Sequence, residues 1–437
     1  MLTTLKNAFK IKELRRKIFF TMAMLVVIRL GSQLPVPGVD REAFAAWFAA
    51  RTGDAFSFFD AITGGSFENF SILALSISPY ITSSIIMQLL TIAIPKLEEM
   101  QRDGEDGRKK IVAITRYVTV VLALVQATAM VIGFGMQGYL VEYNALNVIT
   151  AVAALTAGSA FLMWVGERIT EKGVGNGISI VLVINIISRL PQDLGRLFEQ
   201  FVYGKAPATA ILAVVIIFAI IIAMVILVII LNGGVRKIPV QYAKKVQGRK
   251  MVGGQTSNIP LKVNTSGVIP IIFASSIMQM PIIICSFIGY EGTGVWGEIL
   301  KGLNSSYWCV PSQPTYSIGL LVYIVLIVFF AYFYTSITFN PLMIADNMKK
   351  QGGFIPGIRP GKPTSDYLSK VLNYIVIIGA VGLIIVSVIP YFFNGVFGAS
   401  VSFGGTSLII IVSVILETMK QIESQMLVRN YKGFLED

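Results

Sequence analysis

Long apolar runs, separated by short polar segments, repeat along the whole chain. A helix crosses the hydrocarbon core of a membrane with about twenty mostly apolar residues. Ten runs approach that length, at 18–34, 71–94, 117–136, 145–166, 175–190, 206–231, 263–288, 316–339, 371–393 and 399–416. The pattern predicts an all-α membrane protein with ten transmembrane helices. Because no stretch between the runs could form a soluble domain, we expect a single polytopic unit.

The segment 56–70, FSFFDAITGGSFENF, does not fit a full span. It is apolar and aromatic, but it carries Asp60, Glu68 and the Gly64-Gly65 pair. It is therefore too short and too polar to cross a bilayer. Irregular backbone at membrane depth needs protein or a water-filled cavity around it, which predicts a re-entrant or plugging element. The alternative is an amphipathic helix lying on the bilayer surface.

Composition and charge support a membrane location and indicate an orientation. Apolar residues make up 54% of the chain and charged residues 14%, against about a quarter charged in soluble domains. Most of the 36 Lys and Arg fall in segments that share a side with both termini. The positive-inside rule places this side in the cytoplasm. The basic N-terminus leads into an apolar run without a small-residue cleavage site, so we expect no cleaved signal peptide.

Two cytoplasmic loops are unusually basic. Loop 233–262 contains no acidic residue, and loop 340–370 contains only Asp346 and Asp366. Basic cytoplasmic loops already follow from the positive-inside rule. A loop of this length without an acid also suits docking on a polyanion, either lipid headgroups or the phosphates of ribosomal RNA.

The sequence contains no pattern that predicts catalysis, a cofactor or a metal site. Histidine is absent, and the two cysteines, Cys285 and Cys309, imply no disulfide framework. Ion-coupled transporters usually carry ionisable residues inside their spans, whereas here Arg29 stands near the outer end of the first span and the interiors are almost free of charge. These observations favour a passage controlled by shape and apolar gating. A secondary transporter of small solutes is the alternative, and an intramembrane enzyme is the least favoured class.

An ordered set of motifs adds a family resemblance. The segments are RLGSQLPVPGVD, ALSISPYITSSIIMQLL, GEDGRKKI, FLMWVGERITEKGVGNGISI, QYAKKVQGR, LKVNTSGVIPIIFASSI, FNPLMIADNMKKQGGFIPGIRPG and FGGTSLIII. From the first span to the tail, the set resembles the bacterial SecY family of protein-export channels. The resemblance implies two pseudo-symmetric, inverted five-helix halves, 1–195 and 196–437, hinged between the fifth and sixth helices. It also implies opening across the membrane for secreted chains, and sideways between the second and seventh helices for transmembrane segments.

The resemblance further implies a ring of apolar side chains at the centre of the channel. By motif, the ring consists of Ile77, Ile81, Ile178, Leu182, Ile272 and Ile410. Residues four apart share a helix face, but isoleucines at that spacing occur in every span, so spacing alone would not select these positions. Leu182 stands where the family often has isoleucine. An apolar neck dewets and so opposes the passage of ions.

Three further groups of residues follow from the same resemblance. The segment 56–70 matches the plug of the family, which decides between its two alternatives. The expected plug residues are Phe59, Asp60, Ile62, Gly64 and Gly65. Polar positions near the lateral gate are Gln88, Ser275 and Ser276, although Ser is also a routine helix-packing residue. Residues in loops that meet the ribosome or the motor are Lys244, Lys245, Arg249, Lys250 and Arg359.

The resemblance also implies partners and a location. We expect small membrane subunits of the SecE and SecG types, the SecA motor ATPase, the ribosome, and signal sequences of precursor polypeptides, all meeting the chain in a lipid bilayer. The expected location is the bacterial cytoplasmic membrane, with both termini in the cytoplasm. No cofactor is expected.

Overall fold

Helices form most of the computed structural model, which describes residues 2–50, 60, 62–203, 207–242, 245–247, 250–252, 256–287, 294–397 and 405–432. Each predicted span contains one helix. These are α2 (Lys12–Gly31), α5 (Ser78–Ala93), α7 (Glu105–Met136), α8 (Ala145–Lys172), α9 (Gly177–Phe201), α10 (Pro207–Gly233), α11 (Ile269–Phe287), α13 (Ile318–Thr338), α15 (Lys362–Phe397) and α16 (Gly405–Lys432). The helical membrane fold predicted from the apolar runs is confirmed, and five short strands in the described parts of the basic loops are added to it.

Not every helix is long and apolar enough to cross a membrane by itself. Six described helices are long and apolar enough. A seventh span is added if α5 and α6 (Pro95–Arg102) count as one, although they are bent by 106° at their junction. Helices α2 and α16 carry charged ends, and the apolar part of α11 is shorter. The predicted span 399–416 also lies partly outside the described residues. The count of ten is consistent with this fold and stays a prediction.

The second span is helical only in its later part, which corrects the prediction of a continuous run over 71–94. Residues 71–77 form turns, and α5 begins at Ser78 with Pro79 in its first turn. The irregular backbone finds partners inside the protein, since Ile72 N donates to Leu34 O at 2.9 Å. Ser71 and Ser76 are fully buried. Such backbone is tolerated at membrane depth because protein surrounds it.

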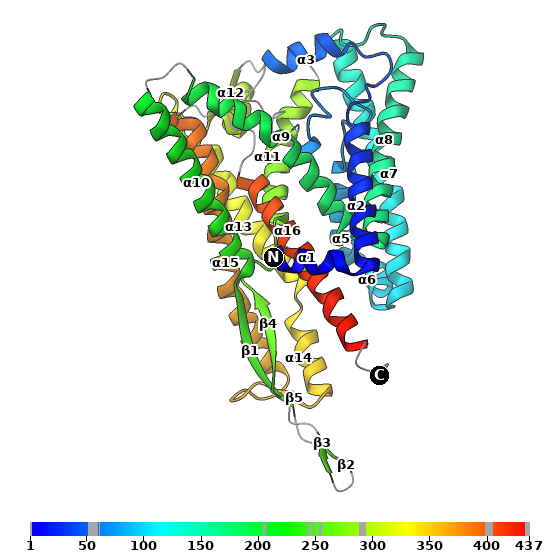
Figure 1. The fold of residues 1–437 in the computed structure, drawn as a ribbon, viewed down its shortest axis with the longest axis vertical. Coiled ribbons are helices and arrows are strands. Elements are labelled where there is room, and N and C mark those ends of the chain that lie inside the picture. The colour runs from blue at the N-terminus through cyan, green and yellow to red at the C-terminus, as the bar shows by residue number, and fades with distance from the viewer. Residues whose placement is uncertain are drawn as a thin grey trace.

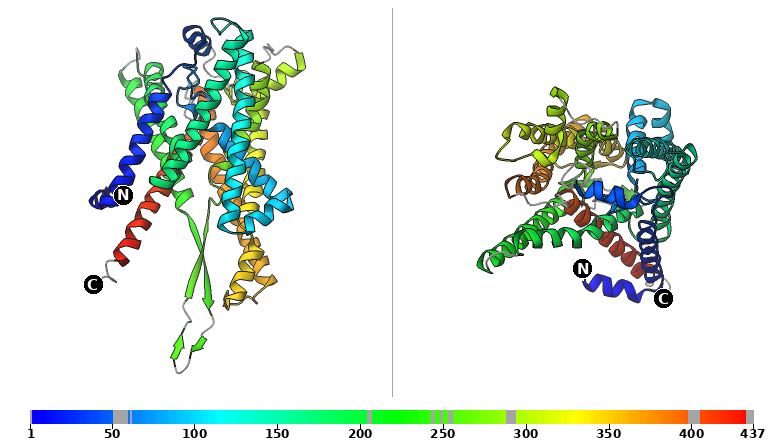
Figure 2. Two further views of the ribbon diagram at one scale, coloured as in Figure 1. Left: turned by 90° about the vertical axis from the view of Figure 1, so that its right-hand side faces the viewer. Right: turned by 90° about the horizontal axis from the view of Figure 1, so that it is seen from above.

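The helices gather into two groups with a third between them. Helices α2, α7 and α8 lie on one side, α10, α13 and α15 lie on the other, and α9, α11 and α16 lie between them (Figure 1). The view from above also separates the N-terminal helices from α13 and α15 (Figure 2). Each side has its own apolar core, one around Phe44 and Phe134 and the other around Tyr323 and Leu383.

Short elements cover the two ends of the bundle. Helices α3 (Arg41–Ala50) and α12 (Gly294–Leu303) lie at one end. Helices α1 (Leu2–Lys10) and α14 (Pro341–Lys350), the last turns of α16 and the strands lie toward the other (Figure 1). The first and last described segments, α1 and the end of α16, are therefore on the side of the basic loops.

The two basic loops form one structure, which the sequence did not predict. In the first loop β1 (Val235–Tyr242) pairs antiparallel with β4 (Thr256–Lys262). In the second, β5 (Gly353–Phe354) adds to the free edge of β1. Ile238, Val240 and Leu261 pack from this sheet against Met348 and Leu368. At the tip, the backbone of β2 (Lys245–Gln247) pairs with that of β3 (Lys250–Val252), so the hairpin projects far from the bundle (Figure 1).

Candidate functional site

The six expected ring residues converge in one apolar cluster. They come from four helices and the residue before one of them: Ile77 directly precedes α5, Ile81 lies in α5, Ile178 and Leu182 in α9, Ile272 in α11 and Ile410 in α16. Ile77, Leu182 and Ile410 are buried, and the other three are partly buried. Side chains more than 300 residues apart in the sequence therefore meet between the two groups of helices.

A close approach by α8 completes this cluster. A Cβ at Gly166 of α8 would lie 3.2 Å from Ile178 Cγ1 and 3.5 Å from Ile77 Cδ1. Apart from Tyr80, the residues of the cluster have purely hydrocarbon or thioether side chains. A neck of such carbons cannot replace the hydrogen bonds of water, so it opposes the entry of water and ions.

A polar contact fixes the turn that leads into this cluster. Asn185 of α9 donates a hydrogen bond from Nδ2 to Ser76 Oγ at 3.1 Å, and Ser159 of α8 donates to Ser76 O at 3.3 Å. Ser76 has a left-handed backbone with φ +51°, a conformation that is costly for a residue with a Cβ. These contacts join the irregular backbone before α5 to two neighbouring helices.

The described part of the expected plug segment lies inside the protein. Ile62 packs against the cluster that contains the ring residues, and Asp60 is 2% exposed. Phe59 lies outside the described residues. This burial is what a re-entrant element requires, whereas an amphipathic helix on the bilayer surface would expose one face.

The turn at Gly64 and Gly65 brings the plug segment against α9. Both glycines have a left-handed backbone, with φ values of +69° and +83°. A Cβ at Gly64 would lie 2.8 Å from Asn185 Cα, which no side chain could tolerate without a shift of the backbone. Glycine is needed here for both its conformation and its small size.

Two arginines that were not predicted as site residues contact the same segment. Arg29 of α2 donates from Nη1 to Gly64 O at 3.0 Å. Arg189 of α9 forms ion pairs with Asp60 and with Glu68, the latter at 2.6 Å between Nη2 and Oε2. From the sequence, Arg29 is named only as a charge near the end of a span, and Arg189 is not named. The signal for Arg189 is its charge near the end of an otherwise apolar run.

The C-terminal end of the plug segment enters an aromatic cluster. Phe67 and Phe70 pack edge-on against Phe44 of α3, with ring centroids 5.7 and 4.8 Å apart. Phe134 of α7 lies 5.0 Å from the same Phe44 ring. Such contacts between large buried rings fix residues 67–70 firmly to α3 and α7.

The expected gate residues make no polar contact across the gate in this structure. Ser275 is buried, and its hydroxyl donates to Ile271 O at 2.9 Å and Ile272 O at 3.0 Å within its own helix. Gln88 and Ser276 are exposed. Among the described residues no hydrogen bond joins Gln88 to either serine, so their role in the gate stays an expectation.

The basic residues expected to meet partners lie on the projecting loops. Lys245 and Lys250 belong to β2 and β3 at the tip of the hairpin, while Lys244 and Arg249 lie outside the described residues. Arg359 is exposed, and its carbonyl oxygen accepts a hydrogen bond from Thr364 Oγ1 at 2.8 Å. The positions that the structure describes therefore lie where a large partner on that side of the membrane could reach them.

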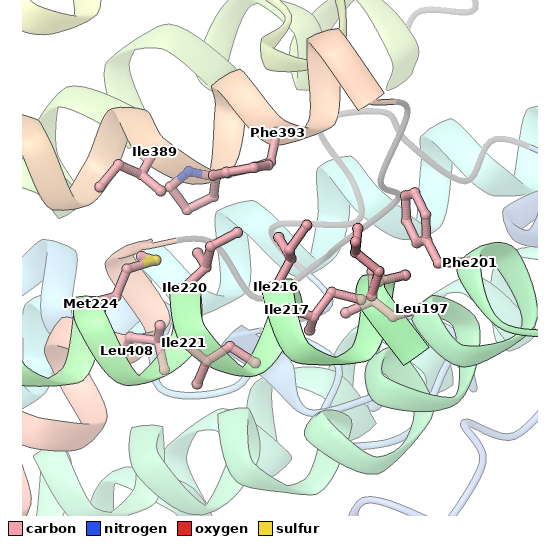
Figure 3. Close-up of a pocket in the computed structure, with 13 residues that line it drawn as sticks. Leu197, Phe201, Ile216, Ile217, Ile220, Ile221, Met224, Ile389, Phe393 and Leu408 are labelled. Carbon is pink, nitrogen blue, oxygen red and sulfur yellow. The ribbon is translucent and has the colours of Figure 1, made fainter. Parts of the chain in front are cut away.

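An apolar cavity of about 270 Å³ lies between α10 and α15 on one side and α9 and α16 on the other (Figure 3). Its walls come from the end of α9, from α10 and α15, and from the start of α16. They consist of Leu197, Phe201, Leu212, Ala213, Ile216, Ile217, Ile220, Ile221, Met224, Ile389, Pro390, Phe393 and Leu408. A site that orients a small solute needs a few placed polar groups. No lining side chain supplies one, so this cavity does not favour a solute transporter.

Metal binding also finds no candidate within the described ranges. No group of three or more His, Cys, Asp or Glu side chains that could hold a metal ion occurs there. The site that the geometry does support is the apolar cluster together with the buried segment beside it.

Comparisons with known proteins agree with this geometry. A family model described as SecY matches residues 71–419. The protein translocase subunits SecY of Halalkalibacterium halodurans and Bacillus subtilis are 42% and 41% identical to this chain, and each alignment covers 100% of both chains. A solved structure described as a protein conducting channel covers 94% of this chain and 92% of its own, at 18% identity and a TM-score of 0.62. Another, which concerns the plug domain of SecY and the closed state of its channel, has the same coverage and identity and a TM-score of 0.64.

Proposed function

This chain belongs to the SecY family, and from that membership we propose that it is the central subunit of a protein-conducting channel. In this proposal, unfolded secretory polypeptides pass through the chain across the membrane. The observation that carries it is the convergence of Ile77, Ile81, Ile178, Leu182, Ile272 and Ile410 from four helices in one apolar cluster. Aliphatic side chains can move aside around a passing peptide without binding any particular sequence.

The resting channel is sealed by this ring and by the buried segment. The ring opposes ions because its side chains offer water no hydrogen bonds. The segment that includes Asp60, Ile62, Gly64 and Gly65 acts as the plug, which its burial and the contact of Ile62 with the ring cluster support. The two halves predicted at 1–195 and 196–437 separate at the ring. Because α9 continues to Phe201, the hinge between α9 and α10 lies after Phe201 and not at residue 195.

Transmembrane segments leave the channel sideways. The gate lies between α5 and α11, beside Gln88, Ser275 and Ser276. The absence of hydrogen bonds between Gln88 and the two serines supports easy separation. An apolar signal sequence then has only packing contacts to replace, and these are weak between helices in lipid.

We propose that the channel lies in a bacterial cytoplasmic membrane, with the basic loops and both chain ends in the cytoplasm. The positive-inside rule supports this orientation, because loop 233–262 carries seven basic residues and no acid. The two chain ends lie toward the same end of the bundle as the β1–β4 hairpin (Figure 1).

The partners are those of an export channel. Small membrane subunits of the SecE and SecG types flank the helices, while a SecA-type ATPase or a ribosome docks on the cytoplasmic loops. Among solved structures with a similar fold is Sec61, which is described in a canine ribosome-channel complex. Its TM-score to this chain is 0.60. The basic tip with Lys245 and Lys250, together with the exposed Arg359, supports such docking. The chain itself is not an enzyme in this proposal, since the partners supply the energy.

Reconstituted transport tests the proposal. The chain and the small subunits that copurify with it are placed in lipid vesicles with the motor ATPase and a radiolabelled precursor. We expect the precursor to become protected from external protease, only when ATP and this chain are both present. Saturable uptake of a small solute, without protection of the precursor, would instead support a secondary transporter.

A further inference from the structure

Arg189 is a buried charge that reaches two carboxylates of the plug segment. Its side chain is 9% exposed, and that of Asp60 is 2% exposed. Arg189 Nη2 also lies 2.6 Å from Glu68 Oε2, whose side chain is 29% exposed. Asp60 and Glu68 stand on either side of the Gly64-Gly65 turn, so one guanidinium bridges both ends of the turn.

The carboxylate of Asp60 also organises the turn itself. Asp60 Oδ1 accepts a hydrogen bond from Glu68 N at 2.9 Å, and Asp60 O accepts one from Gly64 N at 2.8 Å. The fold-back of the segment and its ion pair with α9 therefore depend on the same residue. Asp60→Asn keeps the backbone oxygen and a side-chain oxygen that can accept from Glu68 N, so it removes the charge while leaving the turn its hydrogen bonds.

A second arginine holds the apex of the turn from the opposite helix. Arg29 of α2 donates to Gly64 O at 3.0 Å, and Ser188 of α9 donates to the same oxygen at 3.4 Å. The turn is thus contacted through its backbone by α2 and α9, and through its side chains by α9. A hydrogen bond from a charged donor is stronger than a neutral one.

The rest of the segment is fixed by packing. Phe67 and Phe70 lie in the aromatic cluster with Phe44 and Phe134. The part that can leave while residues 67–70 stay packed is therefore the stretch around Asp60–Ser66. The arginines contact this stretch at Asp60 and Gly64, whereas Glu68 lies in the fixed part.

We propose that Arg189 and Arg29 form an electrostatic latch that positions the plug in the closed channel. This inference rests on the proposed function, and it assigns the closed state to ion pairs and charged hydrogen bonds in addition to apolar packing. Arg189 is the main positioning residue, because it bridges Asp60 and Glu68. Arg29 is the second, because it holds the backbone at Gly64.

Such a latch can open because Arg189 keeps a partner when the plug leaves. Asp193 stands one turn further along α9, is 1% exposed and attracts the charge of Arg189. It remains on α9 whatever the plug does. Removing one partner of a buried ion pair is costly when the other charge is left alone, and Asp193 lowers that cost for Arg189. Glu68 lies between Phe67 and Phe70 in the part that stays packed, so it also remains beside Arg189.

The test is the ion conductance of the resting channel in planar bilayers, measured on the full chain with its copurifying subunits. We expect Arg189→Gln to raise the resting conductance by roughly tenfold, because it leaves the buried carboxylate of Asp60 without its partner. The double variant Asp60→Asn with Glu68→Gln should raise it similarly, because it removes both plug-segment partners of Arg189. The triple variant should leak no more than Arg189→Gln alone, because all three changes break one interaction. Arg189→Lys keeps the charge and should restore most of the seal.

Arg41→Gln is the matched control. Arg41 also bonds the plug segment, from Nη2 to Asn69 Oδ1 at 2.6 Å, but this contact is exposed and lies beyond the turn. We expect Arg41→Gln to leave the resting conductance of the channel unchanged. All variants should still export a precursor, and their conductance with a precursor trapped inside should equal that of the unmodified chain.

Three outcomes would overturn the latch. The first is an unchanged resting conductance in Arg189→Gln while export continues. The second is additive leaks in the triple variant. The third is a leak in Arg189→Lys as large as in Arg189→Gln. Loss of export by the unmodified chain would instead contradict the proposed function, so the two failures are distinguishable.

Discussion

Gly64 is the single residue at which the plug turn meets α9 most closely. Changing Gly64 to Ala adds a Cβ to a left-handed backbone and places it 2.8 Å from Asn185 Cα. We expect the conformation to cost about 1–2 kcal/mol and the overlap to add about 1–3 kcal/mol. The measurement is the thermal unfolding midpoint in detergent together with the resting ion conductance.

Gly138 supplies the control for that substitution. It has a similar φ of +87°, but nothing lies within 4 Å of a Cβ built there. Gly138→Ala should show only the conformational cost and no leak. If both variants lower the unfolding midpoint equally and neither leaks, the close contact between the turn and α9 does not seal the channel.

Ile272 tests whether the ring is a hydrophobic barrier. Ile272→Asn puts a hydrogen-bonding group among aliphatic side chains, so water can enter the neck more easily. We expect the resting conductance to rise roughly tenfold, as a barrier lowered by about 1.4 kcal/mol would give. Ile272→Leu keeps the apolar surface and should stay sealed. Equal conductance in the two variants would argue against this barrier.

The ring shows why some residues could not be found from the sequence. Ile77 and Ile81 share a helix face, but many other aliphatic pairs in this chain do too. What distinguishes the six residues is that four distant helices bring them into one cluster, and no local pattern encodes that meeting. The family motifs identified them instead. Arg189, by contrast, was detectable as a charge near the end of an apolar run.

At the scale of elements, the apolar runs predicted which segments form helices, but they located the first residues of those helices less accurately. Local capping explains some starts: Asn176 accepts hydrogen bonds from Ile178 N and Ser179 N at the start of α9, and Asn340 does the same for α14. The irregular stretch 71–77 was missed because its backbone partners, such as Leu34 O, lie elsewhere in the chain. The sheet was missed for the same reason, since β1 pairs with a strand more than 100 residues away.

The sheet gives a testable prediction at this scale. Ile238 of β1 is 2% exposed and packs in the core that joins the two basic loops. Ile238→Asp buries a carboxylate without a partner, at a cost of about 3 kcal/mol or more. We expect the hairpin to become sensitive to trypsin, while the membrane helices stay protected.

The neighbouring residue provides the matched control. Lys237 lies on the same strand but is exposed. Lys237→Asp introduces the same carboxylate and should leave the trypsin digestion of the other basic sites unchanged. Equal digestion of the two variants would mean that the apolar core does not hold the loops together.

At the scale of the whole molecule, the arrangement predicts which ends face which compartment. In a chain without Cys285 and Cys309, a cysteine at Arg359 should react with a membrane-impermeant maleimide only in inside-out vesicles. A cysteine at Val295 of α12, which is 80% exposed, should react only in intact cells. The reverse labelling would contradict the orientation drawn from the basic loops.

The two groups of helices also explain why the ring lies where it does. Each group has its own apolar core, around Phe134 and around Tyr323, whereas the ring cluster is formed by the helices between the groups together with α2, α5 and α8. Separation of the groups would open the ring and leave both cores intact. This division of the core was not visible in the sequence, because both groups read as similar apolar runs.

The most direct test of the central claim is site-specific cross-linking during export. With Cys285 and Cys309 removed, a single cysteine is placed at Ile81 or Ile272, and a secretory precursor is stalled in transit. A cysteine at Val325 of α13, which is 57% exposed on the outside of the bundle, is the control. We predict cross-links from both ring positions to the precursor and none from Val325. Active export without a cross-link from either ring position would contradict a route through this cluster.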